Sequence, residues 1–476
     1  MGSKFILLIC FPLFTAFNVM AVEDKTKTGD SNTVTATESG KNPLFAALES
    51  ALRNNREILS AQDELMALHE NHVSASASFR PTVSANTQYQ SVDKKMWRSK
   101  SSGDGARNNV RSYGLTLKQN IFHGFADVAA LNEVDFNIKA KWSAYETTKQ
   151  NVLRNVAICY FVVIAKKQEI VHLNVLLDSR KESISVATEM HRTGVAKYLD
   201  VAQAEASYAE TMSKLAKAEA EYASYMAQFE EISGYKMPDG AVAPGKLFDD
   251  AMSEKQALDI AVKHNPGIIA ATNVLQAAKA AVKKINPEFT PSLDMTCSFD
   301  HSVELTKRGS GENADQAKNK YNTRGCTFGV ALTVPIYDGG AVRAEKRKHV
   351  KMASKAAVDR EKAIEELKTQ ISSVWASITA AKKNLVAAKS AVKARELALH
   401  DTNEEYKAGV KIMKDVLEAQ GQLFEAKYLE IQAEQEYFSN QCKANALVGR
   451  MDARYLKVKD GDFSYKKHFA ETSGKF

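Results

Sequence analysis

An internal repeat constrains the fold of this chain more than any other feature. Residues 47–55 (ALESALRNN) recur in similar form at 257–265 (ALDIAVKHN), and residues 113–117 (YGLTL) recur at 328–332 (FGVAL). Later residues also correspond in order, Gly194, Asp200 and Val201 matching Gly409, Asp415 and Val416. A repeat of this kind indicates one structural unit that is built twice and packed against itself. An active site in one ordinary globular core would not account for this arrangement.

The repeat and its flanks predict the order of elements along the chain. Each copy should begin with a short helix (about 44–78 and 254–286), followed by two strands around a polar loop. A glycine turn should then lead into two long helices, and an equatorial segment around 236–249 should end the first copy. The predicted segments are a signal peptide (1–21), a disordered N-terminal segment (22–43), the first repeat (44–250), the second repeat (251–455) and a polar C-terminal tail (456–476).

The N-terminus has the pattern of a secretory signal. Lys4 precedes a short apolar run at residues 5–17, and small residues allow cleavage after Ala21. The run is shorter than the ~20 residues that a membrane-spanning helix needs. Beyond it the sequence contains no apolar run of that length. If the mature protein enters a membrane, we expect it to do so as β-strands.

The predicted strands alternate apolar and small polar residues with a period of two. Each alternating run is about ten residues long, which suits the ~9–11 residues of a tilted strand crossing a bilayer. A soluble sheet with one wet face is the alternative. Four strands are too few to close a barrel, so their edges must pair with another chain. The predicted apolar positions are Tyr113, Leu115, Leu117, Leu293, Met295, Cys297, Phe299, Phe328, Val330, Leu332 and Val334.

The predicted long helices carry heptad repeats. A helix over residues 126–192 would be about 100 Å long at 1.5 Å per residue. A single apolar stripe on so long a rod cannot form a globular core and must pack against other rods. The heptad positions are Val201, Tyr208, Leu215, Tyr222 and Phe229, with Ala204, Ala218, Tyr225 and Ile232 beside them, and Ile364, Ile371, Ile378, Leu385, Val392 and Leu399.

Charge and composition argue against several classes of function. The net charge is +7, and positive and negative residues are interleaved along the chain without a basic cluster. This pattern argues against nucleic-acid binding. His69 and His72 are three residues apart and are predicted on a solvated helix face, so no metal or cofactor is expected. Cys297 and Cys326 flank a strand loop. They could form a cross-strand disulfide or serve as two small apolar side chains, and the sequence leaves both roles open. The sequence shows no arrangement of a nucleophile and a base that would predict an enzyme.

Two local motifs, together with the repeat, resemble the outer-membrane efflux family typified by TolC. They are residues 334–340 (VPIYDGG), at the strand-to-helix turn, and residues 406–419 (YKAGVKIMKDVLEA). The resemblance implies an α+β membrane protein in which each chain gives four strands to a trimeric 12-stranded β-barrel. It also implies a long coiled α-helical barrel that continues as a tunnel through the periplasm. The implied partners are outer-membrane lipid, a periplasmic adaptor and an inner-membrane transporter, either ABC-type or proton-driven.

The resemblance also implies where the channel is gated. Asp415 and Glu418 map to the carboxylates that line the periplasmic aperture of the family. Asp200, Tyr406 and Lys411 map to contacts that lock the gate, and Gly194 and Gly409 to the helix breaks. The sequence departs from the family at three places: Lys411 replaces arginine, Leu199 replaces a hydroxyl residue and Glu418 replaces aspartate. Capping of helix N-termini is the alternative role for Asp200 and Asp415.

The function implied is passive conduction, across the periplasm and outer membrane, of substrates from an inner-membrane pump, in efflux, in type I secretion or in both. A periplasmic adaptor or coiled-coil scaffold of an export complex is the alternative, although an adaptor would not need a doubled chain with strands of bilayer length. The sequence leaves open whether the cargo is a protein, a drug or a metal ion.

Overall fold

The structure is a computed structural model that describes residues 42–95, 105–238, 241, 252–285, 290–308, 318–456 and 458. These residues belong to one of the two compact units of the chain, Asn42–Phe476. The predicted signal peptide lies outside the described residues. So do nearly all of the predicted N-terminal segment and tail, and most of the segment at 236–249.

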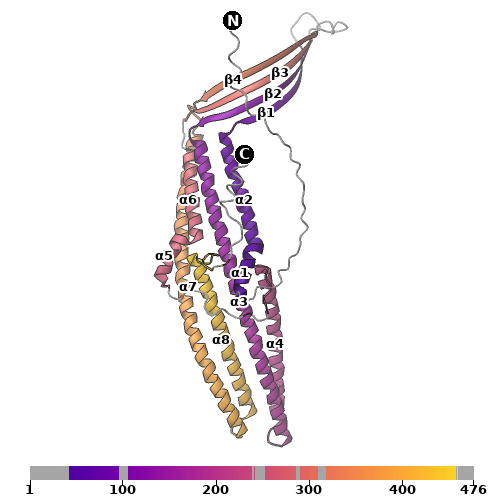
Figure 1. Ribbon diagram of the computed structural model, residues 1–476, viewed down its shortest axis with the longest axis vertical. Helices are drawn as coiled ribbons and strands as arrows, with labels where there is room; N and C mark the ends of the chain where they lie inside the picture. The colour runs from indigo at the N-terminus through magenta and orange to yellow at the C-terminus, as the bar shows by residue number, and fades with distance from the viewer. Residues whose placement is uncertain are drawn as a thin grey trace. The chain divides into compact units, whose positions relative to one another are not determined.

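The order of elements occurs twice, as the repeat predicts. Each copy consists of two helices, two strands and two longer helices (Figure 1). Among the described residues no helix is long and apolar enough to cross a membrane. The first copy contains α1 (Pro43–Asn54), α2 (Arg56–Ser76), the 3-10 turn η1 (Ala77–Phe79), β1 (Thr82–Lys95), β2 (Gly105–His123), α3 (Ala126–Arg192) and α4 (Tyr198–Ser233). The second contains α5 (Glu254–His264), α6 (Pro266–Lys284), β3 (Ser292–Arg308), β4 (Lys318–Thr333), α7 (Ala341–Lys407) and α8 (Met413–Val448).

The two longest helices follow turns of left-handed backbone. α3 and α7 each contain 67 residues, and the predicted bounds of α3 are confirmed. Gly124 and Phe125 have φ of 59° and 64° before α3, and Gly339 and Gly340 have φ of 72° and 87° before α7. Glycine adopts such angles without steric cost, which explains three of these four positions, and Phe125 is the non-glycine residue among them.

The predicted single short helix of each copy is wrong, because an asparagine divides it in both. Asn55 separates α1 from α2, and Asn265 separates α5 from α6, each with extended backbone. Each side-chain oxygen caps the next helix by accepting two backbone N–H groups. Each Nδ2 donates to a carbonyl at the end of a long helix, Ile232 O at 2.8 Å and Leu447 O at 2.9 Å. The same residue therefore ties the short helices to the long ones in both copies.

The four strands form one antiparallel sheet in the order β1-β2-β3-β4 (Figure 1). Its strands contain 14 to 19 residues and are longer than the ten predicted, because polar residues near the loops continue the backbone ladder. The register joins Ala85 to Leu115 and Leu115 to Phe299, and it joins Phe299 to Cys326. Directly paired residues point to the same side, so the predicted apolar positions within the strands share one face of the sheet. Val334 lies just after the end of β4 and is not part of the ladder.

The same register rules out a direct cross-strand pairing of the two strand cysteines. Cys297 lies opposite Phe328, and Cys326 lies opposite Phe299. Although both side chains are on the apolar face, they are offset by two residues. No disulfide joins them, and the interpretation as small apolar fillers agrees with this arrangement.

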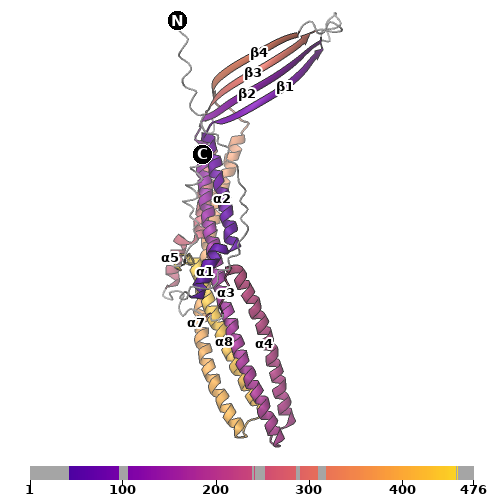
Figure 2. The same ribbon diagram turned by 45° about the vertical axis from the view of Figure 1, so that its right-hand side comes forward.

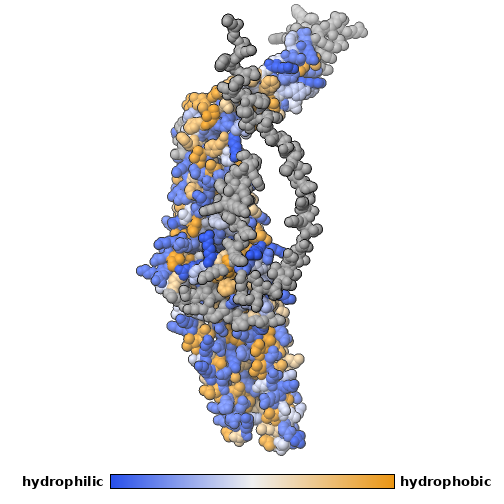
Figure 3. Space-filling model, viewed as in Figure 1, coloured by the Kyte–Doolittle hydropathy of each residue, from blue (hydrophilic) through white to orange (hydrophobic). Residues whose placement is uncertain are grey.

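The helices lie side by side in open layers. The long hairpins pack in the order α4, α3, α8, α7, and α2, α3, α6 and α7 are neighbours in the same way (Figures 1 and 2). The predicted heptad positions of α4 and α7 are all buried or half-buried. The largest core cluster gathers α1 and the middle of α3 around Leu44, Leu48, Tyr160 and Phe229. In Figure 3 hydrophobic side chains are interspersed with hydrophilic ones along the visible helices.

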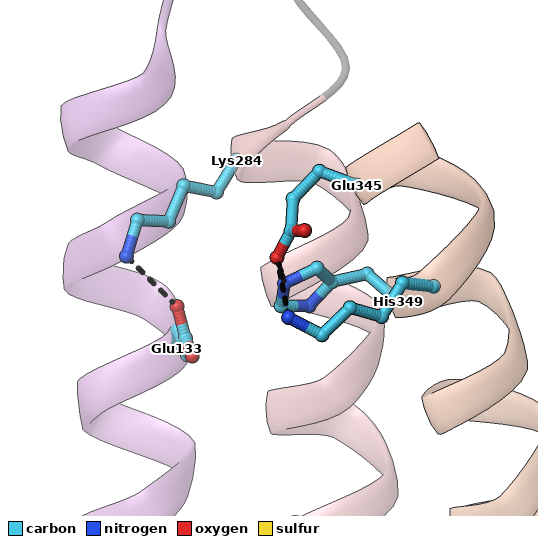
Figure 4. Close-up of polar contacts among 5 residues, drawn as sticks. Glu133, Lys284, Glu345 and His349 are labelled. Carbon is cyan, nitrogen blue, oxygen red and sulfur yellow. Dashed lines mark hydrogen bonds and ion pairs between the residues drawn. The ribbon is translucent and has the colours of Figure 1, made fainter. Parts of the chain in front are cut away.

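Two pairs of charged residues connect or brace the helices near the sheet. Lys284 of α6 lies 3.4 Å from Glu133 of α3 and so links the two copies, and Glu345 accepts from His349 one turn along α7 (Figure 4). Because these side chains are partly exposed, each pair contributes little stability.

The prediction of a solvated face for His69 and His72 is wrong. His69 is only 3% exposed, because α2 packs against α3 at this position. His72 is half-buried, and its Nδ1 lies 2.8 Å from Asp135 Oδ1 of α3. The two imidazoles therefore belong to a helix interface.

Candidate functional site

The tips of the two long hairpins carry every site residue that the sequence predicts. Gly194 and Gly409 end α3 and α7, and each has φ of 78°. A Cβ at either position would meet no atom within 4 Å, so the backbone angle, not crowding, favours glycine. In both tips the residue after the glycine donates to a carbonyl five residues earlier, Val195 N to Met190 O and Val410 N to Glu405 O, both at 2.9 Å. α3 ends at Arg192 and α7 ends at Lys407, each two residues before its glycine.

Asp200 and Asp415 occupy equivalent positions in the first turns of α4 and α8. The Lys197 amide donates to Asp200 Oδ2 at 3.1 Å, and the Ile412 amide donates to Asp415 Oδ2 at 3.2 Å. Each carboxylate therefore satisfies an amide just before its helix and lies at the positive end of the helix dipole. The alternative capping role is present for both residues, and an aperture role for Asp415 would be additional to it.

Glu418 lies one turn after Asp415 on α8 and is exposed. Its Oε1 accepts a hydrogen bond from Gln422 Nε2 at 3.2 Å on the same exposed side. Residues three apart share a helix face, so the two carboxylates are neighbours. The corresponding position in the first hairpin is Gln203, so the acidic pair distinguishes the second tip.

The three predicted latch residues are not hydrogen-bonded to one another within one chain. The hydroxyl of Tyr406 donates to Met190 Sδ at 3.0 Å. Burial raises the pKa of Tyr406, and the negative charge of Asp200 raises this pKa further, so the two side chains lie near each other. Lys411 is exposed. Its charge is available to a group outside the chain.

An apolar tip cluster holds the two hairpins together beside these polar groups. Tyr406 and Ile184 pack against it from α7 and α3. Its buried members are Ala187, Val201, Ala204, Met413, Val416 and Leu417. Separating the hairpins would therefore expose apolar surface and disfavour an open tip.

A buried polar contact between α3 and α8 escaped the sequence predictions. Arg180 is 7% exposed, and its Nη2 donates to the Leu417 carbonyl at 2.7 Å. Gln420 Nε2 lies 2.8 Å from Ser179 Oγ and 3.2 Å from Ser183 Oγ. Burial lowers the pKa of Arg180. Because a buried guanidinium is costly to leave unbonded, this contact fixes the axial position of one hairpin against the other.

No metal centre is part of this arrangement. Within the described ranges no group of three or more His, Cys, Asp or Glu side chains could hold a metal ion. The tips combine charged exposed groups with an apolar contact between hairpins, which suits an opening that is held shut and can be pulled apart.

Comparisons with known proteins identify the family of the chain. A sequence profile of the family described as "Outer membrane efflux protein" matches residues 47–234 and 257–450. The chain is 25% identical over 435 residues to the outer membrane efflux protein BepC of Brucella suis, covering 91% of both chains. It is 23% identical over 363 residues to the outer membrane protein TolC of Escherichia coli, covering 74% of this chain and 72% of TolC.

Solved structures share the fold at low sequence identity. The chain superposes on a membrane protein from Pseudomonas aeruginosa with a TM-score of 0.75 and 18% identity, covering 86% of this chain and 94% of the other. For the CmeC outer membrane channel of Campylobacter jejuni the TM-score is 0.73 at 16% identity, covering 91% and 89%. The profile match over both repeats, and the relatives that cover most of the chain, lead to one conclusion: this chain belongs to the outer membrane efflux protein family.

Proposed function

We propose that three copies of this chain assemble into a conduit that carries substrates out of the cell through the outer membrane. An inner-membrane transporter, ABC-type or proton-driven, would deliver the substrate and supply the energy. A periplasmic adaptor would join the transporter to the hairpin tips. The chain itself would conduct passively, without a cofactor.

The open edges of the layers carry this proposal. β1 and β4 are the two edge strands of the sheet, and each presents unpaired backbone groups along one side. In the helical layer α4 and α7 are the outer members. Val386 and Leu397 of α7 are more than 60% exposed there. One chain leaves both edges of both layers open, and neighbouring copies related by rotation would cover them all.

The two faces of the sheet suit a closed ring of twelve strands. The apolar face is exposed in one chain: Val83, Leu115, Phe299, Phe328 and Leu332 are each more than half exposed. Turned outward, these side chains would contact lipid, while the polar face would line a water-filled lumen. Four strands from each of three chains would give such a ring an ordinary size.

The hairpin tips would form the periplasmic end of the conduit. Asp415 and Glu418 of three chains would converge on one aperture, while Asp415 also caps α8. Exposed Lys411 of one chain would pair with Asp200 of its neighbour and hold the aperture closed. These roles rest on the position of the residues at the tips and on the family resemblance.

The number of copies tests the proposal. The full-length protein should fractionate with the outer membrane and run as a trimer when its mass is measured in mild detergent, with the trimer lost in SDS. Chemical cross-linking in cells should co-purify an inner-membrane transporter. A stable monomer with its full β-sheet content would overturn the proposal, because the strand edges would then need no partner.

A further inference from the structure

The sheet separates its charges between its two faces. Asp294, Asp300 and Glu304 of β3 point to the polar face, because they alternate with Leu293, Phe299 and Val303. Glu304 is held there by Asn108 Nδ2 at 2.6 Å. Arg111, Lys320 and Arg324 point the other way.

Three exposed basic residues lie on the apolar face, between its apolar residues and the strand loops. Arg324 pairs with His301, two residues beyond Phe299, and Lys320 pairs with Leu305. Arg111 pairs with Val303 in the row between them. Arg111, Lys320 and Arg324 form the basic border. At ~3.3 Å per residue, the border begins about 7 Å beyond Phe299 and extends over about 13 Å.

The basic border has no acidic partner among the side chains that the structure describes. No ion pair involves its three side chains among the described residues, and Arg111 instead lies over the Tyr89 ring at 5.6 Å. Among the described residues of the strands, the acid on this face is Asp93 of β1, four residues beyond Tyr89 toward the loop. An unpaired guanidinium is a good ligand for phosphate, which it binds with two parallel hydrogen bonds.

We propose that the basic border binds the phosphate groups of anionic lipids in the outward-facing leaflet of the membrane. The inference rests on the proposed function, because it needs the apolar face to contact lipid. Acyl chains would then cover Phe299, Phe328 and Val330, and the border would lie at the depth of the lipid headgroups. Charge complementarity favours a phosphorylated lipid over a neutral one.

Lipid titration of the detergent-purified full chain tests the inference. The probes are lipid A and dephosphorylated lipid A, with binding measured by native mass spectrometry. A triple variant, Arg111→Gln, Lys320→Gln and Arg324→Gln, removes the border. Each basic side chain near an anionic headgroup is worth a factor of roughly 5, so the variant should bind lipid A on the order of 100-fold more weakly.

Two further variants exclude general effects of charge and folding. Lys118→Gln, Lys351→Gln and Lys382→Gln remove the same charge from the polar face and from α7, and this variant should bind as wild type does. Arg111→Lys with Arg324→Lys keeps the charge but loses the two parallel hydrogen bonds of each guanidinium, so its affinity should lie between those of wild type and the triple variant.

The outcomes separate this inference from the proposed function. If the wild-type protein is trimeric but binds both forms of lipid A equally, the border is not a phosphate site. Equal binding by wild type and the triple variant would overturn the inference in the same way. A wild-type protein that is monomeric and does not enter vesicles would overturn the proposed function, and this inference with it.

Discussion

Neutralising the two carboxylates at the tip of the second hairpin should weaken the block of the channel by multivalent cations. The variant is Asp415→Asn with Glu418→Gln, which removes six negative charges from a trimer. Amides are the right replacements because Asp415 accepts the Ile412 amide. Alanine would lose that hydrogen bond at a cost of about 1 kcal/mol, whereas the side-chain oxygen of asparagine can still accept it.

The size of the effect follows from Coulomb's law. A monovalent cation about 10 Å from one carboxylate in water gains about 0.4 kcal/mol, so six carboxylates give about 2.5 kcal/mol. Screening at physiological salt reduces this to about 1 kcal/mol. A trivalent cation gains about three times as much, so its block should weaken on the order of 100-fold in the variant.

Planar-bilayer recording provides the assay. A trivalent cation is added on the side of the hairpin tips, and its blocking concentration is compared between wild type and variant. Asp401→Asn with Glu425→Gln is the matched control, because it removes the same charge from exposed positions in the same hairpin. If the tip variant and the control keep the wild-type block, the aperture charge lies elsewhere, and Asp415 is a helix cap only.

Three further perturbations have defined outcomes. Lys411→Ser should raise single-channel conductance by removing the proposed pairing with Asp200 of a neighbouring chain. Lys414→Ser removes the same charge from another exposed position of the tip and should not raise it; equal effects would refute the latch. Asn55→Ser keeps the helix cap but loses the hydrogen bond to the end of α4, so it should lower the free energy of unfolding by about 1 kcal/mol in thermal melts. Asn54→Ser, at an exposed position, should leave the free energy of unfolding unchanged. If the two variants melt at the same temperature, Asn55 does not have this role. Burial raises the pKa of Cys442 to about 12. Iodoacetamide at pH 8 should therefore alkylate this thiol only after denaturation. Labelling of Cys442 in the folded protein would show that its surroundings open to solvent.

The long helices were predictable because their ends have strong local signals. Gly124, just before α3, and Gly194, just after it, mark the two ends of this helix. The heptads between such breaks specify which sides of the helices are buried. The two faces of the sheet were predictable for the same reason, since alternation assigns each side chain to a face before the register is known.

Features that depend on tertiary contacts were not predictable. Asparagine is a weak helix breaker alone, and Asn55 divides its helix because a carbonyl of α4 accepts its amide. The register that offsets Cys297 from Cys326 depends on pairing across the whole strand. Arg180 has no sequence signal of its own, and Gly421 of α8 is explained only by the fold, because a Cβ there would lie 3.5 Å from Arg180 Nη2. His69 needed α3 beside it to be recognised as buried.

Disulfide trapping between β1 and β4 tests the assembly most directly. Within one chain these strands are separated by β2 and β3, about 14 Å apart at ~4.8 Å per strand, which is too far for a disulfide. In a background without the native cysteines, Ser84→Cys or Asn86→Cys in β1 is combined with Thr327→Cys or Ala331→Cys in β4. A ring of three copies predicts oxidised dimers and trimers, and nothing larger, on a non-reducing gel. Monomer alone across the whole panel, or a ladder extending beyond three copies, would contradict it.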